Sequence, residues 1–398
     1  MTQHQPSRRA FTRALALGAA GLGLAATGIR PASAATAGTQ DTGGDQLSNL
    51  DKMRLTTPGS LQGTLRHADG TWSGLSLSLQ PGGLATQGGP RAVAAMPDGR
   101  LQFLAYGADG HLYHCIRFPD GSWQRWVRLN DDATDKNFVG GPVAMAVTPD
   151  YCAHVMAIDK NGGLQYNLRA PDGSWQGWQP VVVSAADGKT FRALDMAVAA
   201  LPNNNVKVFA YDASGSLQTT DRWALVGRPP GTGVWDYTGW HPVPGAPRSN
   251  TVPSTTSNLA ATGMPDGTVQ IVTAFMNNPV YHTIMNRDGS TYQDIGWAPV
   301  PGDDRGRFNG CDVAITGMSD GSAQLVAVRS DSTVGHVIRN ADGSWTAPDY
   351  LFAWDIPGDP AHPPFDPGHP EQVQVLNATA VAAAGLPDGS MYTLATMA

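Results

Sequence analysis

Tryptophan and arginine residues recur together along this chain, each time beside an Asp-Gly dipeptide. The clearest copies read LYHCIRFPDGSWQRW at Leu112–Trp126 and LQYNLRAPDGSWQGW at Leu164–Trp178. The indole of a tryptophan presents a large apolar face, and the guanidinium of an arginine donates paired hydrogen bonds to hydroxyl or carboxylate oxygens. Together the two side chains could bind a sugar ring, whose C–H face is apolar and whose edge carries hydroxyls.

The two tryptophans of one copy stand three residues apart. In a regular strand an odd separation sends side chains to opposite faces, so we expect one indole to pack between sheets and the other to face outward. Trp72 and Trp345 occur without a second tryptophan, which favours the second position as the more exposed one. The candidate ligand-stacking residues are therefore Trp126, Trp178, Trp240 and Trp297. Packing between sheets is the alternative for all of them.

Arginines occupy a fixed place in most copies. Four of them stand three residues before the turn aspartate: Arg66, Arg117, Arg169 and Arg339. A fifth copy has Met285 in that place. We expect the arginines to donate hydrogen bonds to a ligand, and the alternative is an ion pair with a turn aspartate of the neighbouring repeat.

A second series stands six residues before the turn aspartate. Its members are Gly63, His114, Tyr166, His282 and His336. We expect the histidines to be hydrogen-bonded interior groups, with a place in the binding site as the alternative.

The Asp-Gly turns recur with a period of about 50 residues, which is typical of propellers and solenoids. They begin at Asp69, Asp120, Asp172, Asp288 and Asp342. The third gap is about twice the others, and Gly233–Gly245 supplies a degenerate copy there with an enlarged loop. Further turns, such as MPDG at Met96 and ADG at Ala108, divide each period into four short strands.

Four antiparallel strands joined by tight turns form one propeller blade. Residues 61–79 supply only the last two strands of a blade, and residues 378–398 only the first two. Together they complete a composite blade and leave no free sheet edge. The sequence therefore predicts an all-β, six-bladed β-propeller over residues 61–398, closed by N- and C-terminal strands. A seventh blade in Phe352–Val375 is the alternative.

Composition agrees with an all-β chain. The 398 residues include 47 Gly and 30 Pro, which disfavour long helices. One glutamate stands against 32 aspartates and 5 lysines against 21 arginines. Asp and Gly favour turns, whereas Glu and Lys favour helix surfaces, so these choices indicate strands and turns.

The repeat of a strand, an Asp-Gly turn and spaced tryptophans resembles that of the tectonin-like and PLL-like propeller lectins. The resemblance covers Leu61–Ala398. It implies sugar binding in shallow pockets between neighbouring blades, and it implies no catalysis.

The first 34 residues resemble a bacterial twin-arginine (Tat) export signal. Arg8 and Arg9 precede an apolar run over Ala14–Ile29, and an A-x-A cleavage pattern ends at Ala34. A membrane anchor is the alternative, which the four glycines of the short apolar run disfavour. We therefore expect a secreted protein with no stable membrane insertion after cleavage.

Cleavage would leave an acidic chain in which residues 35–60 form a linker to the propeller. It removes four arginines and no acid, so the formal charge falls from −7 to about −11. A protein that follows the phosphates of a nucleic acid needs a basic face. The charge therefore excludes nucleic acid as a partner and disfavours anionic membrane surfaces.

A secreted enzyme is the alternative function, because propellers often carry hydrolases or lyases in loops of one face. The chain has no G-x-S-x-G and no H-E-x-x-H motif. The best group for catalysis or a metal lies in the Asp355–Gln372 loop, which holds Asp359, His362, Asp366, His369 and Glu371. Their spacing matches no fixed metal pattern, and the prolines of the loop favour a rigid solvated segment. We expect no cofactor and no metal.

The cysteines do not indicate a metal site either. Cys115, Cys152 and Cys311 lie far apart without C-x-x-C spacing, which excludes a zinc ribbon and a disulfide-dense scaffold. At most one disulfide can form, and we expect small buried side chains in strands.

The sequence as a whole predicts a Tat-exported propeller that binds extracellular or cell-surface glycans. Its sites would be repeated and individually weak, and they would gain strength through multivalency. The alternatives are a secreted hydrolase or lyase acting on a polysaccharide or small metabolite, and a structural partner protein of the cell envelope.

Overall fold

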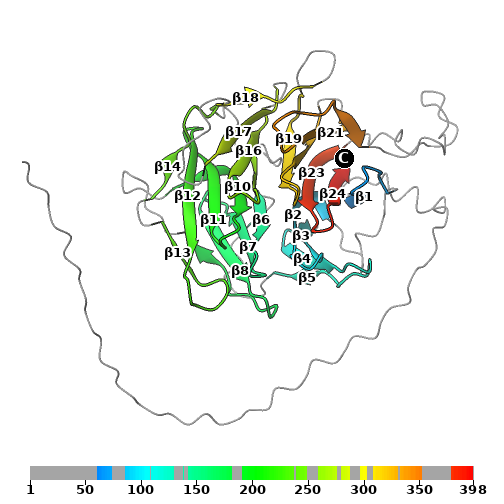
Figure 1. The fold of residues 1–398 in the computed structure, drawn as a ribbon. Coiled ribbons are helices and arrows are strands. Elements are labelled where there is room, and N and C mark those ends of the chain that lie inside the picture. The colour runs from blue at the N-terminus through cyan, green and yellow to red at the C-terminus, as the bar shows by residue number, and fades with distance from the viewer. Residues whose placement is uncertain are drawn as a thin grey trace, which may run out of the picture. The chain divides into compact units, whose positions relative to one another are not determined.

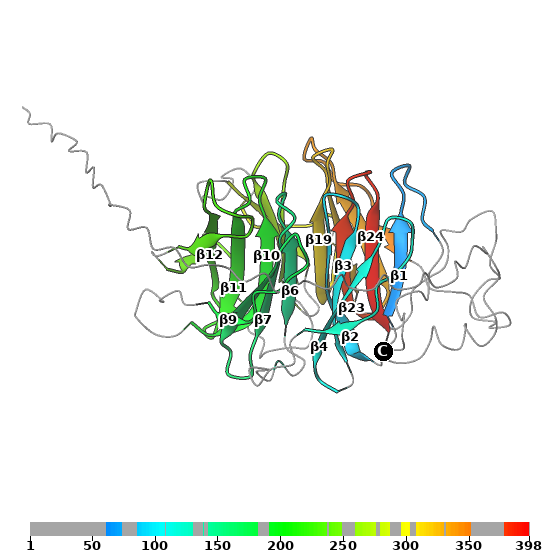
Figure 2. The ribbon, with the colours of Figure 1, turned by 90° about the horizontal axis from the view of Figure 1, so that it is seen from below.

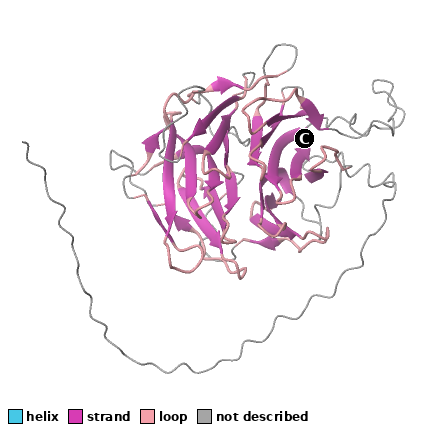
Figure 3. Cartoon of the chain, in the orientation of Figure 1, coloured by secondary structure: helices cyan, strands magenta, loops and turns pink. Residues whose placement is uncertain are grey.

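The computed structural model describes residues 61–73, 86–107, 109–129, 138, 142–181, 191–236, 239–248, 259–275, 279–286, 296–302, 308–329, 332–351 and 378–397. All of them belong to one compact unit, Asp45–Ala398. The described residues form strands, turns and loops, and no helix (Figure 3). None of this part of the chain forms a helix long and apolar enough to cross a membrane.

Six antiparallel sheets stand in a ring, as the six-bladed prediction requires (Figures 1 and 2). Each sheet is one blade, and the chain runs through its strands from the inside of the ring outward. The innermost strands are β2 (Thr86–Ala95), β6 (Val143–Val147), β10 (Ala193–Ala200), β15 (Leu259–Gly263), β19 (Asp312–Gly317) and β23 (Ala378–Gly385). Five blades are named here after these strands, and the blade that contains β23 is called the closing blade.

The second and third strands form the body of each blade. The second strands are β3 (Leu101–Gly107), β7 (Ala153–Ile158), β11 (Val206–Asp212), β16 (Val269–Thr273), β20 (Ala323–Val328) and β24 (Met391–Met397). The third strands are β4 (Leu112–Arg117), β8 (Leu164–Arg169), β12 (Leu217–Ala224), β17 (Tyr281–Met285), β21 (Val334–Arg339) and β1 (Leu61–Arg66). Most of their residues are buried, because sheets on both sides cover them.

The outer strands are short. They are β5 (Val127–Arg128), β9 (Gln179–Pro180), β18 (Ala298–Pro299), β22 (Asp349–Leu351), and the pair β13 (Gly233–Trp235) and β14 (His241–Pro242). Both members of that pair hydrogen-bond to β12, so the β10 blade has five strands. Short outer strands leave little unpaired edge for association with other chains.

The two ends of the propeller meet in the closing blade. Strand β1 pairs with β24 along its whole length, from Leu61–Thr396 to Arg66–Met391, and β24 pairs with β23. This confirms the composite closure predicted from the sequence. The fourth strand expected near residues 71–79 lies largely outside the described residues, as does Phe352–Val375, where a seventh blade was the alternative.

Asp-Gly turns close the hairpins by a common arrangement. Oδ1 of Asp120 accepts hydrogen bonds from the backbone N–H (2.9 Å) and the hydroxyl (2.7 Å) of Ser122. Asp172 and Asp342 make the same pair of bonds to the serine two residues on. Gly121 has φ +86°, a conformation that suits glycine best. These bonds set where each third strand stops and the chain turns back.

The core lies between neighbouring blades, where apolar side chains of one sheet meet those of the next. Strands β2 and β3 pack against β23 and β24 through Phe103, Leu394 and their neighbours. On the axis, a cavity of about 160 Å³ is lined by the ends of all six innermost strands. Small residues such as Ala146, Ala199 and Gly263 allow these strands to converge there.

Side-chain hydrogen bonds join three innermost strands to one another. Thr262 Oγ1 accepts from the Gly317 N–H (2.8 Å), and Thr316 Oγ1 accepts from the Gly385 N–H (2.7 Å). A Cβ on Gly317 or Gly385 would lie 2.8 Å from a carbonyl oxygen of the preceding blade. Glycine therefore permits the close approach that these bonds need.

Replacing Thr316 with valine should destabilise the propeller. The change keeps the shape of the side chain and leaves the half-buried Gly385 N–H without its acceptor, which costs about 1 kcal/mol. Urea denaturation followed by tryptophan fluorescence measures the loss. Thr379→Val, at an exposed position of β23, is the control and should change stability by less than about 0.5 kcal/mol. Equal effects of the two changes would contradict a role for this bond in joining blades.

Candidate functional site

A buried glutamine–histidine pair joins the second and third strands in the β2, β15 and β19 blades. The histidine Nε2–H donates to the glutamine Oε1, at 2.9 Å for His114–Gln102 and at 3.0 Å for His282–Gln270 and His336–Gln324. The two residues of a pair are diagonal neighbours on one face of the hairpin. All three histidines are buried, which confirms that they are hydrogen-bonded interior groups.

A tryptophan of the next blade contacts each of these histidines with a nearly perpendicular ring. The centroid distances are 5.2 Å for Trp175–His114, 5.2 Å for Trp345–His282 and 5.5 Å for Trp72–His336, with interplanar angles of 80°, 85° and 90°. Each is the first tryptophan of its copy, and each is half-buried. The first position therefore lies at the junction between blades.

An arginine stands beside each of these tryptophans. Isolated antiparallel β-bridges pair Arg66 with Trp72, Arg169 with Trp175 and Arg339 with Trp345. The two side chains of each pair therefore lie on one face of their hairpin. The guanidinium folds back over the turn, where a Cβ on Gly173 would lie 2.9 Å from Nη2 of Arg169. All three arginines are half-buried.

The junctions combine a cationic guanidinium with a neutral imidazole. Burial, together with the charge of Arg169 from the next blade, lowers the pKa of His114 to about 3. Burial and the next blade's arginine also lower the pKa of His282 and His336 to about 3. Burial lowers the pKa of Arg66, whereas Asp349 and Asp69 raise it. The histidines therefore stay uncharged across the ordinary pH range.

The junction between the closing blade and the β2 blade has the same plan with other residues. Tyr392 takes the place of the glutamine, and Gly63 that of the histidine. A Cβ on Gly63 would overlap the Tyr392 hydroxyl, so the glycine makes room for the larger ring. The Arg117 Cζ lies 5.7 Å from the Tyr392 ring centroid and 6.0 Å from that of Trp123. Four junctions thus carry an arginine next to a half-buried tryptophan.

Two junctions depart from this plan. Between the β10 and β15 blades, buried Met285 takes the place of the arginine, and Lys207 Nζ pairs with Asp221 at 2.8 Å within the β10 blade. Between the β6 and β10 blades, the Arg222 Cζ lies 5.0 Å from the Tyr166 ring centroid.

Sequence reasoning missed Arg222, because the degenerate copy has no Asp-Gly turn at which to align it. The spacing from Leu217 to Arg222 equals that from Leu164 to Arg169. An alignment of the third strands alone would have found it.

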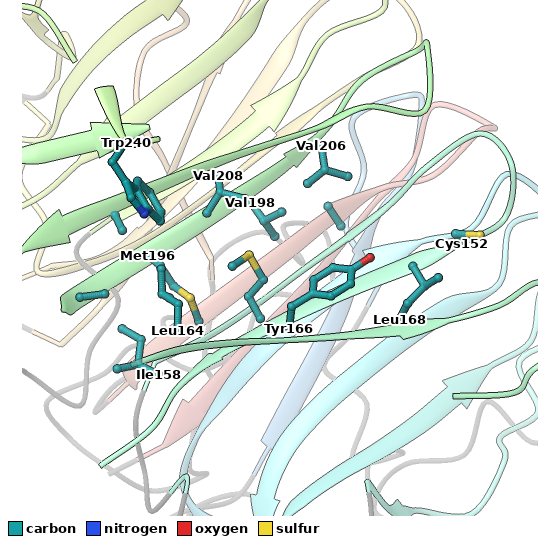
Figure 4. Close-up of a cluster of buried hydrophobic side chains, with 14 residues drawn as sticks. Cys152, Ile158, Leu164, Tyr166, Leu168, Met196, Val198, Val206, Val208 and Trp240 are labelled. Atoms are coloured by element: carbon teal, nitrogen blue, oxygen red, sulfur yellow. The ribbon is translucent and has the colours of Figure 1, made fainter. Parts of the chain in front are cut away.

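The second tryptophans pack mainly against segments that lead into their own blades. Trp240, which is 5% exposed, stacks on Phe191 with centroids 3.9 Å apart and planes 9° apart. Trp178 lies 4.6 Å from Phe138, and Trp297 Nε1–H donates to the Pro244 carbonyl at 3.2 Å. Trp126 packs against the apolar cluster between the closing and β2 blades. In Figure 4, Trp240 and Tyr166 lie at different places in one cluster of buried side chains.

The expectation that the second position is the more exposed one is therefore wrong for Trp240. The structure brings the four predicted arginines together with the first tryptophans instead. These are Trp72, Trp123, Trp175 and Trp345.

The turn aspartates serve their own hairpins. Hydrogen bonds from Ser174 lower the pKa of Asp172, and Arg169 of the same hairpin contributes a smaller part. For Arg169, the turn aspartate that acts on the guanidinium is thus Asp172 of its own hairpin. Each arginine is held over its own turn and faces the preceding blade.

Other candidate groups lie elsewhere. The Asp355–Gln372 loop falls outside the described residues. Among those that are described, no three His, Cys, Asp or Glu side chains gather closely enough to hold a metal. Cys115, Cys152 and Cys311 form no disulfide, and the first two are buried as expected.

A scan against protein-family models and a search of curated proteins gave no match. Solved structures do match. BP39L lectin from Burkholderia pseudomallei is 18% identical over 82% of this chain and 88% of its own, with a TM-score of 0.47. AofleA from Arthrobotrys oligospora is 15% identical over 71% and 77%, with a TM-score of 0.48. Aleuria aurantia lectin, described as a six-bladed propeller with a novel fucose recognition mode, is 13% identical over 76% and 87%, with a TM-score of 0.47.

The chain is similar to these solved structures, of which the Aleuria aurantia lectin is described as a six-bladed β-propeller. The assignment of a six-bladed β-propeller rests on the six sheets of this chain.

The buried histidines should make stability depend on pH below neutrality. His114, His154, His282 and His336 have folded pKa values of about 3 against 6.5 for the ordinary group. Below pH 6.5 the unfolded chain takes up protons that the folded chain does not, so the free energy of unfolding falls as the pH drops. At pH 5 the loss should reach up to about 2 kcal/mol per histidine.

Denaturation midpoints at pH 7.5 and pH 5 measure this dependence. His282→Gln and His336→Gln should each reduce the difference between the two pH values, whatever their effect on stability at pH 7.5. If the difference between the two pH values stays the same in both variants, these histidines take up protons in the folded chain at the same pH as in the unfolded chain, which would contradict the prediction.

Proposed function

We propose that this protein is a carbohydrate-binding β-propeller whose sites lie at four junctions between blades. Each site consists of an arginine that donates to sugar hydroxyls and a first-position tryptophan that contacts the C–H face of the ring. The arginines are Arg66, Arg117, Arg169 and Arg339, and the matching tryptophans are Trp72, Trp123, Trp175 and Trp345.

The observation that carries this proposal is the recurrence of one polar and aromatic arrangement at separate junctions. Packing alone needs no arginine there, and Met285 fills the same place in another blade. Moreover, Arg66 Nε is buried and has no hydrogen-bond partner among the described residues. A buried donor without a protein partner is costly, so packing alone does not explain the arginine.

A neutral sugar fits these junctions better than an anion does. At three of the four junctions the imidazole beside the arginine is held neutral, and the chain as a whole is acidic. At one junction Asp349 accepts a hydrogen bond from Trp72 Nε1 at 3.4 Å, which places a carboxylate next to Arg66. A hydroxyl both donates and accepts hydrogen bonds, so it suits a site that combines an arginine donor with a carboxylate acceptor.

Four similar sites on one ring favour binding to surfaces that display many copies of a sugar. A shallow site that holds one sugar ring binds it weakly, and several sites acting together raise the overall affinity. The export signal predicted over residues 1–34 supports a role outside the cell, on extracellular or cell-surface glycans. Oligomerisation would multiply the sites further.

The second tryptophans have a different part in this proposal. Trp178, Trp240 and Trp297 pack against the segments that enter their blades and so hold the junctions in shape. Trp126 supports the apolar side of the junction next to the closing blade. We expect their loss to reduce stability more than it reduces binding at a given site.

The test is a glycan array followed by calorimetry with methyl α-L-fucoside, methyl α-D-mannoside and methyl β-D-galactoside. Each of Arg66→Ala, Arg117→Ala, Arg169→Ala and Arg339→Ala should remove about one site from the measured stoichiometry, because each change deletes the main donor of one junction. The variant with all four changes should lose array binding at least 100-fold, which corresponds to about 2.7 kcal/mol or more.

A matched pair of tryptophan variants separates stacking from packing. Trp175→Ala should remove one site, whereas Trp178→Ala should keep the number of sites and lower stability by about 2–3 kcal/mol. Absence of glycan binding by the intact chain, or full binding by the fourfold arginine variant, would contradict the proposal.

A further inference from the structure

The junction between the β6 and β10 blades differs from the four arginine junctions in one respect: the chain itself fills it. Arg222 is only 6% exposed, and its Nη2–H donates to the Gly231 carbonyl at 2.7 Å. The N–H of the same Gly231 donates to Oδ2 of Asp150 at 3.1 Å. One backbone residue therefore satisfies an arginine from one blade and a carboxylate from the other.

The rest of this junction follows the common plan. Trp235 meets Tyr166 nearly perpendicularly at 5.3 Å, as the tryptophans of three other junctions meet their histidines. Tyr166 is hydrogen-bonded to His154 at 2.9 Å and stands where those blades have the histidine of their pair. Arg222 lies over Tyr166 in the place of the other arginines. This junction therefore holds an arginine and a tryptophan like the other four, but its arginine is covered by the chain and does not face solvent.

The occupant is the segment Leu225–Thr232, which connects β12 to β13. Its residues up to Pro230 are exposed, and Gly231 is buried. Gly231 has φ +75°, and a Cβ there would overlap Leu168 and lie 3.0 Å from Cys152 Sγ. Only glycine allows the backbone to enter so far. Figure 4 shows Leu168 and Cys152 at the end of the cluster toward which the Tyr166 hydroxyl points.

We propose that Leu225–Thr232 is an internal occupant of a fifth sugar site, and that Gly231 marks where ligand atoms bind at the four open junctions. This inference rests on the proposed function. Asp150 stands in the turn between the first two strands, three residues before β7. The same place in the other arginine junctions holds Asp98, Asp266, Asp320 and Asp388.

The bonds of Gly231 define the chemistry of the ligand. The ligand places an oxygen acceptor against the arginine and, next to it, a donor against the turn aspartate. Adjacent hydroxyls of a sugar supply both. Phosphate is an anion at neutral pH and would face the aspartate with a like charge.

Shortening the hairpin tests the proposal. Because Ala224 and Gly233 are cross-strand partners, residues 225–232 can be replaced by Asn-Gly, which forms a two-residue hairpin turn. Calorimetry with the three methyl glycosides named above should then show one site more than the intact chain. Adding Arg222→Ala to the shortened chain should remove that extra site. Inorganic phosphate should bind to none of these proteins.

A second variant covers the case in which the shortened chain does not fold. Gly231→Val keeps the length of the segment but cannot keep its buried position, so it should also add a site that Arg222→Ala removes. An unchanged number of sites in the folded variants, a gain that survives Arg222→Ala, or phosphate binding at the new site would each overturn the inference. If the intact chain binds its sugar and neither variant gains a site, the inference fails and the proposed function stands. If no sugar binds to the intact chain or to any variant, both fail.

Discussion

The hydrogen bonds that close the Asp-Gly turns fix the register on which the candidate sites depend. An aspartate that accepts from the residue two positions on holds the turn between the third and fourth strands at one length. The arginine three residues before it and the tryptophan three residues after it then become cross-strand partners. A shift by one residue would place the two side chains on opposite faces.

This register also explains why the arginine needs the glycine of the turn. The guanidinium lies close over that residue in three hairpins, where a Cβ on Gly70, Gly173 or Gly343 would come within about 3 Å of Nη2 of the arginine. If a positive φ were the only requirement at the second residue of the turn, asparagine could stand there in some copies. The Asp-Gly pair therefore shapes the turn and also makes space for the group that is proposed to bind the ligand.

The architecture could be predicted well from the sequence, because turn chemistry and period are local properties that survive divergence. The blade count, the strand order and the composite closure all followed from the spacing of Asp-Gly turns. The interior place of His114, His282 and His336 also followed from their position in the strand. The assignment of the tryptophans was less successful, since it assumed a regular strand from the first tryptophan to the second.

The structure shows why that assumption failed. Trp123 forms an isolated bridge, residues 124–126 are irregular, and β5 then pairs over only two residues. Alternation of faces does not hold across such a break. Arg222 escaped notice for a related reason, because an enlarged loop had replaced the turn that served as the reference point.

Different residues at equivalent positions make the six junctions unequal. Met285 and the Lys207–Asp221 pair replace the arginine plan at one of them, and Gly231 fills another. The ring keeps its closure in both cases, since the apolar contacts between sheets are independent of the polar groups at the junctions. Binding capacity can therefore be altered at one junction without rebuilding its neighbours.

The most direct measurement of the central claim is a crystal structure of the protein soaked with the methyl glycoside that it binds best. The account predicts sugar density at the junctions of Arg66, Arg117, Arg169 and Arg339. It predicts none at the Met285 junction or beside Gly231. Sugar density at Trp240, at Trp297 or in the axial cavity, with the four arginine junctions empty, would contradict it.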